Sequence, residues 1–359
     1  MGGSLPLTAQ SKRQGGLSLV ELMVGVVVGM LTILAIMQAV VFFEGQKRTT
    51  TGAANAEENG LLGTFLIERD IRMAGFGLVG TGCTTIRTYN ENANPKDFTI
   101  SGLPVTITQN TPAAGVDRIE VTYSTSAYGS IPATIQQNMP DSSAILRVNN
   151  GIGFVQGQLV LISQPPKDCT AVQVSQNGQQ TGQANITGPG TQWNLQHNPG
   201  GQFTFNPPGG HNIFPAGGYT TGARATNMGS MVTRRYYIQN DNLMMDELVT
   251  TGAAAGTFTT QTLVNGIVAL RAEYGRDTGT DGYLDVFDNT APASGDRLVA
   301  VRIGLVARVG VFENNMVSPA TLPALWSGGP VVNLNSDQRH YRYKSFTTVI
   351  PLRNTIWNN

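Results

Sequence analysis

The sequence predicts an α+β fold, in which a long N-terminal helix, transmembrane and then amphipathic, packs on a C-terminal β-rich globular domain. The first observation is an apolar run of 27 residues, Leu17 to Phe43, whose only strongly polar side chains are Glu21 and Gln38. The second is a series of short β patterns after Gly77, separated by Gly, Pro and Asn. The charged fraction is 13%, about half the usual ~25%, which suits a β-rich domain outside the cytoplasm.

Length and charge set further limits. With 359 residues and 40% hydrophobic content, the chain can bury a sizeable core in one large domain or two ordinary ones. Acidic and basic residues balance at 23 each. No global field therefore draws the protein to nucleic acid or to acidic lipid, and we expect no nucleic-acid partner.

The apolar run predicts a membrane span. At 1.5 Å per residue it is ~40 Å long, more than the ~30 Å that the hydrocarbon core requires. A secretory signal peptide also has a basic start, but its apolar region is ~7 to 15 residues long and ends in a small-residue cleavage site. Lys12 and Arg13 precede the span and Lys47 and Arg48 follow it, so charge alone orients it poorly. We expect a short cytoplasmic leader because the bulk of the chain has the composition of an exported domain.

The helix is expected to continue beyond the membrane as far as about Ala74, roughly 85 Å in all. No proline lies between Pro6 and Pro95, and Gly75 is a natural stop. Apolar side chains alternate with charged ones in the pattern of a half-buried helix, at Leu62, Phe65, Leu66 and Met73. Each glycine inside the helix weakens it by ~1 kcal/mol relative to alanine, which predicts local melting around Gly45, Gly52, Gly60 and Gly63.

Strands are expected throughout the remaining chain. The clearest patterns cover 118–123, 144–148, 158–163 and 171–175. The strongest is LVAVRIGLVARVG, which places Val299, Val301, Ile303, Leu305 and Val309 on one face and Arg302 and Arg308 on the other. The stretch 177–222 is rich in Gly, Pro, Gln, Asn and Thr, and its lack of periodicity predicts a long surface excursion.

Three residues around the start of the apolar run carry a family resemblance. Gly16, Leu17 and Glu21 resemble the processing site of type IV pilins and type II secretion pseudopilins, in which a basic leader ends in glycine. The resemblance implies that a prepilin peptidase cuts after Gly16, that Leu17 becomes the N-methylated mature N-terminus, and that Glu21 acts in assembly as the fifth mature residue. The family usually has phenylalanine at the first mature position, so Leu17 is a departure.

Glu21 also has a physical explanation. A carboxylate costs up to a few kcal/mol at the bilayer centre, and positions i and i+4 of a helix share a face. After cleavage, the amine of Leu17 would lie within reach of Glu21 of the same chain or of a neighbouring subunit. The alternative is a glutamate at the lipid interface that favours the helix N-terminus. Gly25 and Gly29 either let helices approach closely or are simply tolerated in a membrane helix.

Further segments narrow the resemblance to PilW-type minor pilins. They are FLIERDIRMAGFG, RRYYIQ, LVNGIVALRAEYGRD, VAVRIGLVARV and FTTVIPLRN, in that order along the chain. The resemblance implies a leader at 1–16, a transmembrane assembly half-helix at 17–43, an amphipathic half-helix at 44–75 and a β-rich pilin-like domain at 76–359. The middle of the chain carries little of this resemblance.

The resemblance also implies a role and a location. A minor pilin joins other minor pilins and the major pilin on an inner-membrane assembly platform, where it primes or caps the pilus and supports pilus biogenesis, motility or adhesion. The chain would be a single-pass protein of the bacterial inner membrane with a periplasmic domain, and later part of an extracellular pilus (fimbrium). The alternative is a J-class minor pseudopilin of type II secretion.

Cys83 and Cys169 are the only cysteines. Two are too few for a disulfide framework, and they lack the spacing of a zinc site. They are enough for one bridge, which an exported domain favours. Closing a loop of that length would contribute ~4 kcal/mol by the chain-entropy estimate. Buried free thiols are the alternative.

The segment RDTGTDGYLDVFD resembles a calcium loop, in which carboxylates at alternate positions surround a hard cation. We expect Asp277, Asp281 and Asp285 as ligands, with Tyr283 contributing its carbonyl, if calcium is the cofactor. Gly279 takes the place of one expected ligand, and Asp288 that of the final glutamate. The alternative is a solvated Asp/Gly turn between strands. No other cofactor is indicated.

The sequence does not predict an enzyme. His197, His211 and His340 lie far apart, and none belongs to a protease or phosphate-loop motif. A membrane-tethered enzyme would require a pocket that holds a perturbed acid and base pair. An adhesin or DNA-binding tip subunit is a separate alternative, through the excursion at 177–222 or through Arg234 and Arg235, although adjacent arginines on a strand more often form a solvated edge.

Overall fold

The computed structural model describes residues 16, 18–78, 80–113, 115–128, 131–177, 193–209, 211–251, 254–279, 281–292 and 297–356. The chain divides into two compact units, one ending at Ala53 and the other running from Ala54 to Asn359. The first unit contains the N-terminal part of the helix α1. The second contains the rest of α1 and all the strands of the described residues.

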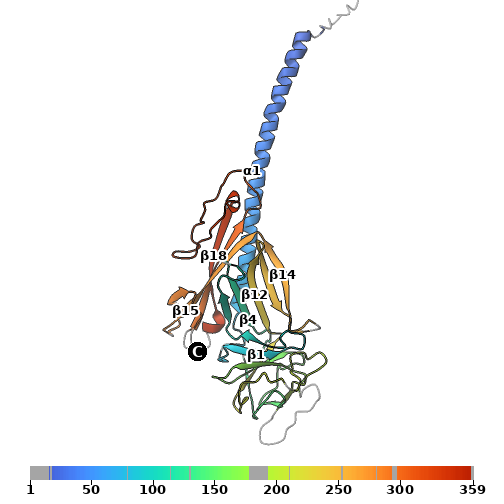
Figure 1. Ribbon diagram of the computed structural model, residues 1–359, viewed down its shortest axis with the longest axis vertical. Helices are drawn as coiled ribbons and strands as arrows, with labels where there is room; N and C mark the ends of the chain where they lie inside the picture. Colours follow the sequence, from blue (N-terminus) through green and yellow to red (C-terminus); the bar gives the residue numbers. More distant parts are fainter. Residues whose placement is uncertain are drawn as a thin grey trace, which may run out of the picture. The chain divides into compact units, whose positions relative to one another are not determined.

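Helix α1 runs from Leu19 to Met73, a continuous 55 residues (Figure 1). Its bounds agree closely with the expected ones, and the predicted fold class is confirmed. Glu21 lies in its first turn and Arg72 in its last turn, where each charge interacts favourably with the helix dipole. Left-handed glycines follow the helix, because Gly75 has a φ of 80° and Gly77 a φ of 77°.

Two antiparallel sheets pack against the part of α1 that belongs to the second unit. The five-stranded sheet has the order β14-β13-β12-β4-β3. Its strands are β3 (Val105–Thr108), β4 (Arg118–Tyr123), β12 (Val232–Gln239), β13 (Asn242–Leu248) and β14 (Phe258–Asn265). The four-stranded sheet has the order β16-β15-β17-β18. Its strands are β15 (Ile267–Asp277), β16 (Val286–Asp288), β17 (Arg297–Arg308) and β18 (Tyr343–Pro351).

Two further sheets lie beyond the C-terminal end of α1 (Figure 1). The six-stranded sheet, in the order β2-β1-β8-β7-β11-β5, contains β1 (Thr85–Tyr89), β2 (Asp97–Ser101), β5 (Ala133–Thr134), β7 (Leu159–Ser163), β8 (Cys169–Gln173) and β11 (Arg224–Gly229). The three-stranded sheet, β6-β10-β9, contains β6 (Leu146–Val148), β9 (Gln176–Asn177) and β10 (Trp193–Gln196). Two short helices, η1 (Gln338–His340) and α2 (Arg353–Ile356), complete the described elements.

The main hydrophobic core joins α1 to the two antiparallel sheets. Ile67 and Ile71 of α1 are completely buried in one cluster with Val301, Ile303 and Leu305 of β17. The predicted alternation of this strand is confirmed from Val301 to Val309, but the placement of Val299 was wrong: Leu298 joins the main cluster instead, because the pairing with β15 shifts at this point. The second face of the strand is not simply solvated. Val306 packs there on leucines of the segment 318–334 in a smaller cluster. The six-stranded sheet has its own clusters of buried hydrophobic residues. Each region is therefore stabilised by a hydrophobic core of its own.

The expected strands are present, with bounds that shift by a few residues. The surface excursion expected at 177–222 was wrong for the part that the structure describes. Residues 178–192 lie outside the described residues. After them, β10 joins the three-stranded sheet, and Phe205, Phe214 and Tyr219 are fully buried. These aromatic residues are separated by Gly, Pro and Asn, so the segment enters the core without regular periodicity.

Candidate functional site

The predicted processing site lies at the start of α1. Gly16 is exposed and has open space where a side chain would begin. Leu17 lies outside the described residues. The carbonyl of Ser18 accepts the first hydrogen bond of the helix, from the amide of Leu22 at 3.1 Å. Glu21 is exposed one turn into the helix. Cleavage, methylation and the pairing of Glu21 remain predictions.

The N-terminal half of α1 presents apolar side chains in every direction. Every large hydrophobic residue from Leu19 to Phe43 is at least half exposed. This helix is long and apolar enough to cross a membrane, with a mean hydropathy of 2.6 in its most apolar window and none of that window buried. Such a surface requires lipid or other helices around it.

In the second unit, α1 is held by close contacts at two of its glycines. A Cβ on Gly60 would lie 1.9 Å from the ring of Phe346 in β18, and one on Gly63 would lie 3.3 Å from Leu243 and 3.4 Å from Leu305. From the sequence alone, these glycines are expected to be points of weakness in the helix. The structure shows that Gly60 allows the helix to approach the sheet. Local melting of the helix stays a prediction.

Asp70 anchors the end of α1 through a buried polar network. Its side chain is 1% exposed and forms a 2.8 Å ion pair with Arg234 of β12. Tyr236 also donates a hydrogen bond to the Asp70 carboxylate, and Arg234 reaches Glu247 of β13 at 3.1 Å. Burial and the Asp70 charge raise the pKa of Tyr123, which faces the same carboxylate, to about 12. The sequence did not predict this network.

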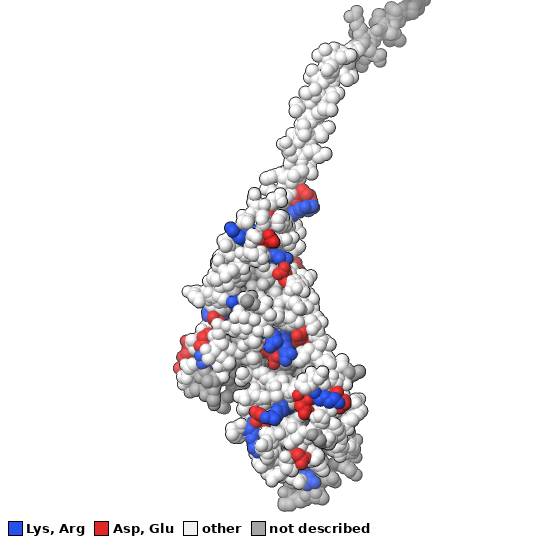
Figure 2. All heavy atoms as spheres, in the orientation of Figure 1, with Lys and Arg blue, Asp and Glu red and all other residues white. Residues whose placement is uncertain are grey.

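The adjacent arginines of β12 are therefore not a solvated edge, because both pair with carboxylates of the fold. Arg235 pairs with Glu120 of β4, and its guanidinium lies 3.8 Å from the centre of the Phe258 ring. For Arg234, burial lowers the pKa but the hydrogen bonds to Asp70 and Glu247 outweigh that effect, so the net shift is upward. Both charges are compensated within the fold. Figure 2 shows charged side chains in small groups of mixed sign on the visible face of the second unit.

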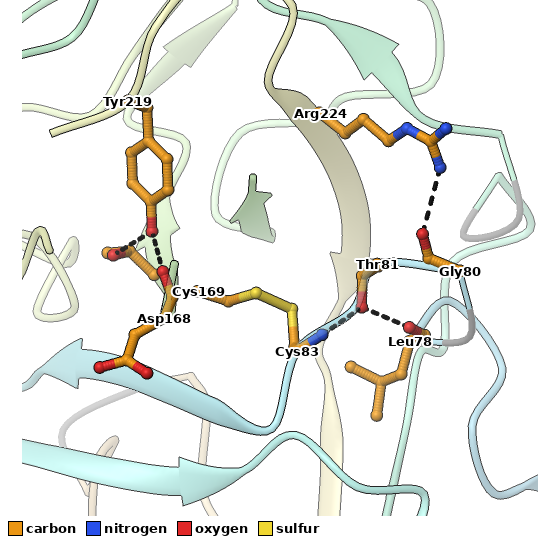
Figure 3. Close-up of a disulfide and its surroundings, with 9 residues drawn as sticks. Leu78, Gly80, Thr81, Cys83, Asp168, Cys169, Tyr219 and Arg224 are labelled. Carbon is orange, nitrogen blue, oxygen red and sulfur yellow. Dashed lines mark hydrogen bonds between the residues drawn. A yellow bond between two sulfur atoms is a disulfide. The ribbon is translucent and has the colours of Figure 1, made fainter. Parts of the chain in front are cut away.

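The structure pairs Cys83 with Cys169, as the sequence predicted. The bridge lies where β1 meets β8, because Ile86 of β1 is the register partner of Cys169. Nearby hydrogen bonds hold both sides in place (Figure 3): Tyr219 donates to the carbonyl of Asp168 at 2.8 Å, and Arg224 donates to the carbonyl of Gly80 at 3.1 Å. The disulfide therefore fastens the segment that leaves α1 to the six-stranded sheet.

The predicted calcium ligands lie at the end of β15 and in its connection to β16. Asp285 Oδ2 accepts hydrogen bonds from the backbone amides of Thr278 at 2.7 Å and Gly279 at 3.0 Å, and Asp281 accepts one from the amide of Tyr283 at 2.9 Å. The hydroxyl and amide of Thr278, followed by the Gly279 amide, lower the pKa of Asp285.

Asp277 is completely buried at the end of β15. Its Oδ2 accepts a 2.8 Å hydrogen bond from the Gly282 amide, while its Oδ1 has no hydrogen-bond partner among the described residues. Asp288 is held in an ion pair by Arg276. Among the described residues, no group of three or more Asp, Glu, His or Cys side chains is arranged to hold a metal ion. Calcium binding stays a prediction, with the hydrogen-bonded turn as its alternative.

The histidines do not converge in the described structure. His197 is buried, which lowers its pKa, and one ring nitrogen lies 2.9 Å from the carbonyl of Ser142. It lines a cavity of about 280 Å³ in which no described lining residue is acidic. His211 lies beside Asp97, and His340 stacks on Phe312. This arrangement provides no acid and base pair at His197.

Comparison with known protein families assigns the C-terminal region. Residues 235–354 match the family described as Type IV Pilus-assembly protein W. This C-terminal region is therefore similar to PilW-type proteins of the type IV pilus. No curated protein and no solved structure matches the chain.

The PilW match runs from Arg235 in β12 to Asn354, just after β18, so it leaves out β3, β4 and every strand of the six-stranded sheet. A pilus-assembly family implies interaction with pilus components in general. The exposed apolar helix fits association with a membrane. PilW is a family of assembly proteins and is not known as a family of enzymes.

Proposed function

We propose that the chain is a minor pilin that joins other minor pilins to prime or cap a type IV pilus, and so supports pilus biogenesis, motility or adhesion. A prepilin peptidase removes residues 1–16, and Leu17 becomes the N-methylated end of the mature chain. The globular domain faces the periplasm before assembly and lies on the pilus afterwards. The observation that carries this proposal is the combination of the PilW match with a helix whose apolar N-terminal half is exposed, starts close to Gly16 and contains Glu21 in its first turn.

The solvent-facing side of α1 in the second unit supports an assembly role. Leu61, Leu62 and Phe65 are 55%, 43% and 59% exposed, although the opposite face of the same helix is buried against the sheets. Exposed apolar side chains that continue along a helix are typical of a protein surface that contacts other subunits. The partners we propose are the major pilin, the other minor pilins and the inner-membrane assembly platform.

The chemistry of the N-terminus tests this proposal most directly. Mass spectrometry of the chain purified from membranes should find N-methyl-leucine at Leu17. A Gly16→Ala variant should keep residues 1–16 and accumulate as the longer precursor, because the peptidase requires the glycine. An intact Met1, or a cut elsewhere in the wild-type chain, would reject the assignment.

Glu21 tests the assembly step separately from processing. We expect Glu21→Val to be cleaved and folded but to be strongly depleted from pili, because the amine of Leu17 loses its partner in the desolvated filament. Gln38→Val is the matched control, since it also removes a polar group from the same apolar run. Equal recovery of both variants in sheared pili would contradict the role of Glu21.

A J-class pseudopilin of type II secretion is the second candidate, favoured by the same N-terminal residues. A deletion strain separates the two. Loss of surface pili, restored by the wild-type gene, supports the pilus assignment, whereas loss of protein secretion with normal pili supports the pseudopilin. A tip adhesin or DNA-binding subunit would leave pilus number unchanged and would lower attachment or DNA uptake.

A further inference from the structure

We propose that the free edge of β18 accepts an extended, uncharged strand from a different membrane-anchored pilus subunit, paired antiparallel to β18. The proposal rests on the proposed function for the identity of the neighbour. It rests on the backbone geometry for the mode of contact.

β18 is the last strand of its sheet, and its outward hydrogen-bonding groups can be identified. It pairs with β17 along its whole nine residues without a bulge. Val309 donates to the carbonyl of Arg342, and Leu352 donates to the carbonyl of Val299, so the even-numbered residues bond to β17. The amides and carbonyls of Ser345, Thr347 and Val349 therefore point away from the sheet. Within the described structure, none of these groups has a hydrogen-bond partner.

The composition of the edge favours pairing. Natural edge strands are usually blunted by charges, prolines or bulges. In β18 the only charged residue is Lys344, which already pairs with Glu57 of α1 at 2.8 Å. The only proline is Pro351, at the last position of the strand. The central residues are small, uncharged and suited to a strand, and Val349 is 48% exposed.

The direction of β18 relative to α1 restricts which strand can pair with it. Lys344 contacts Glu57, Phe346 contacts Gly60, and the side chain of Asn354 reaches the carbonyl of Met73 at 3.1 Å. Residues with higher numbers in and just after β18 therefore contact residues with higher numbers in α1. This means that β18 runs parallel to α1.

A second copy paired through its own β18 is disfavoured by this direction. Antiparallel pairing of two such strands would point the two α1 helices in opposite directions. Two subunits anchored in the same membrane have their helices in the same direction. The neighbour must therefore supply a strand that runs opposite to its own helix.

The other outer strand of this fold shows that such a strand is available in a protein of this architecture. Asn265, at the end of β14, accepts a hydrogen bond from Asn59. Thr259, near its start, pairs with Glu247, which is linked through Arg234 to Asp70. β14 thus runs antiparallel to α1. Figure 1 shows β14 and β18 on opposite sides of the helix. Around a filament, the β18 edge of one subunit would therefore face an outer strand of the β14 type in the next subunit, and the contact would repeat in the same direction.

Val349→Pro tests the edge directly. Proline removes the outward amide of residue 349, blocks the approach of a strand and leaves the even-numbered ladder with β17 intact. Val349→Ala is the matched control, because it shortens the same side chain and keeps the amide. In cells with an intact pilus system we expect Val349→Pro to fall about tenfold in sheared pili relative to Val349→Ala. Both variants should be processed and disulfide-bonded to the same extent.

A second variant covers the case in which the proline disturbs folding. Ser345→Lys keeps the amide and places a charge on the exposed edge, with Ser345→Ala as its control. We expect Ser345→Lys to be depleted from pili in the same way. If Ser345→Lys and a folded Val349→Pro enter pili at the level of their alanine controls, the edge proposal is overturned. The proposed function is not affected by that result.

Two other outcomes would be informative in different ways. Absence of the wild-type chain from pili would reject the proposed function, and with it the neighbour named here. A concentration-dependent dimer of the purified full chain that Val349→Pro abolishes would assign the edge to a second copy and would overturn the choice of partner.

Discussion

At the scale of single residues, the most informative side chain is Asp70. It lies on the polar-looking side of a helix sequence, yet it is buried and receives hydrogen bonds from Arg234, Tyr236 and, at 3.4 Å, Tyr123. If either the carboxylate or its charged partner is removed, the other is left as an uncompensated charge in the core. Asp70 therefore fixes the rotation of α1 against the five-stranded sheet.

Replacing Asp70 should destabilise the domain strongly. We expect Asp70→Ala to lower the free energy of unfolding by ~3–5 kcal/mol, because Arg234 would be left without its buried partner. Arg72→Ala is the control, since Arg72 forms an exposed pair with Glu68 worth only ~0.5 kcal/mol. Urea unfolding of the full chain in detergent measures both. A loss of less than ~1 kcal/mol for Asp70→Ala would mean that the network adds little.

At this scale the sequence predicts some residues and misses others for a clear reason. Glu21 is conspicuous because everything around it is apolar. Asp70 is surrounded in sequence by Glu68, Arg69 and Arg72, and its main partner is 164 residues away. Only the fold brings Arg234 to it. The same holds for Arg234 and Arg235, whose pairing with acidic residues on other elements could not be inferred from their adjacency.

At the scale of elements, the glycines of α1 have different roles that their sequence context does not reveal. Gly45 has no atom within 4 Å of an added Cβ, whereas Gly60 touches the ring of Phe346. The first is a cost to helix stability, and the second allows helix and sheet to approach. Helix propensity alone predicts the same effect of substitution at both positions.

The two glycines should therefore respond oppositely to alanine. We expect Gly45→Ala to increase helix stability by up to ~1 kcal/mol. Gly60→Ala should reduce the unfolding free energy of the domain by about 1–3 kcal/mol, because Phe346 must move out of the core cluster. Thermal unfolding followed by circular dichroism in detergent compares them. Stabilisation by both substitutions would show that Phe346 adapts without loss.

The connection between β15 and β16 gives a test of the calcium prediction. If Asp277, Asp281, Asp285 and the carbonyl of Tyr283 bind calcium, the ion should raise the melting temperature of the full chain. Asp277→Asn should abolish that shift, because it neutralises the buried carboxylate. Asp246→Asn is a control on β13, outside the loop. Equal melting in calcium and in chelator would leave the hydrogen-bonded turn as the complete explanation.

At the scale of the whole molecule, the sequence predicts the helix and the two sheets around it well. It does not predict the architecture of the six-stranded sheet. The helix and the sheets around it follow regular periodicities, and the PilW match lies in this region. The six-stranded sheet combines strands from 85–229, and its order is far from the chain order. Local patterns predict individual strands, but they do not predict which distant strands will be neighbours.

The disulfide should matter most to this less regular region. We expect the Cys83→Ser/Cys169→Ser double variant to lose about 4 kcal/mol of unfolding free energy, because the bridge closes a loop across a sequence separation of 86. The double variant avoids an unpaired thiol. Limited proteolysis should cut within 85–229 before it cuts β15 or β17. Unchanged stability would assign the bridge a role other than folding.

The parallel course of α1 and β18 also determines how the domain would carry a mechanical load. A pull at Ala54 along the axis of the part of α1 that belongs to the second unit would act in shear on the contacts at Glu57, Gly60 and Asp70 together. Contacts loaded in shear share the force, whereas contacts loaded in a peeling geometry fail one after another. Tension that reaches the second unit along its part of α1 would therefore be shared among these contacts.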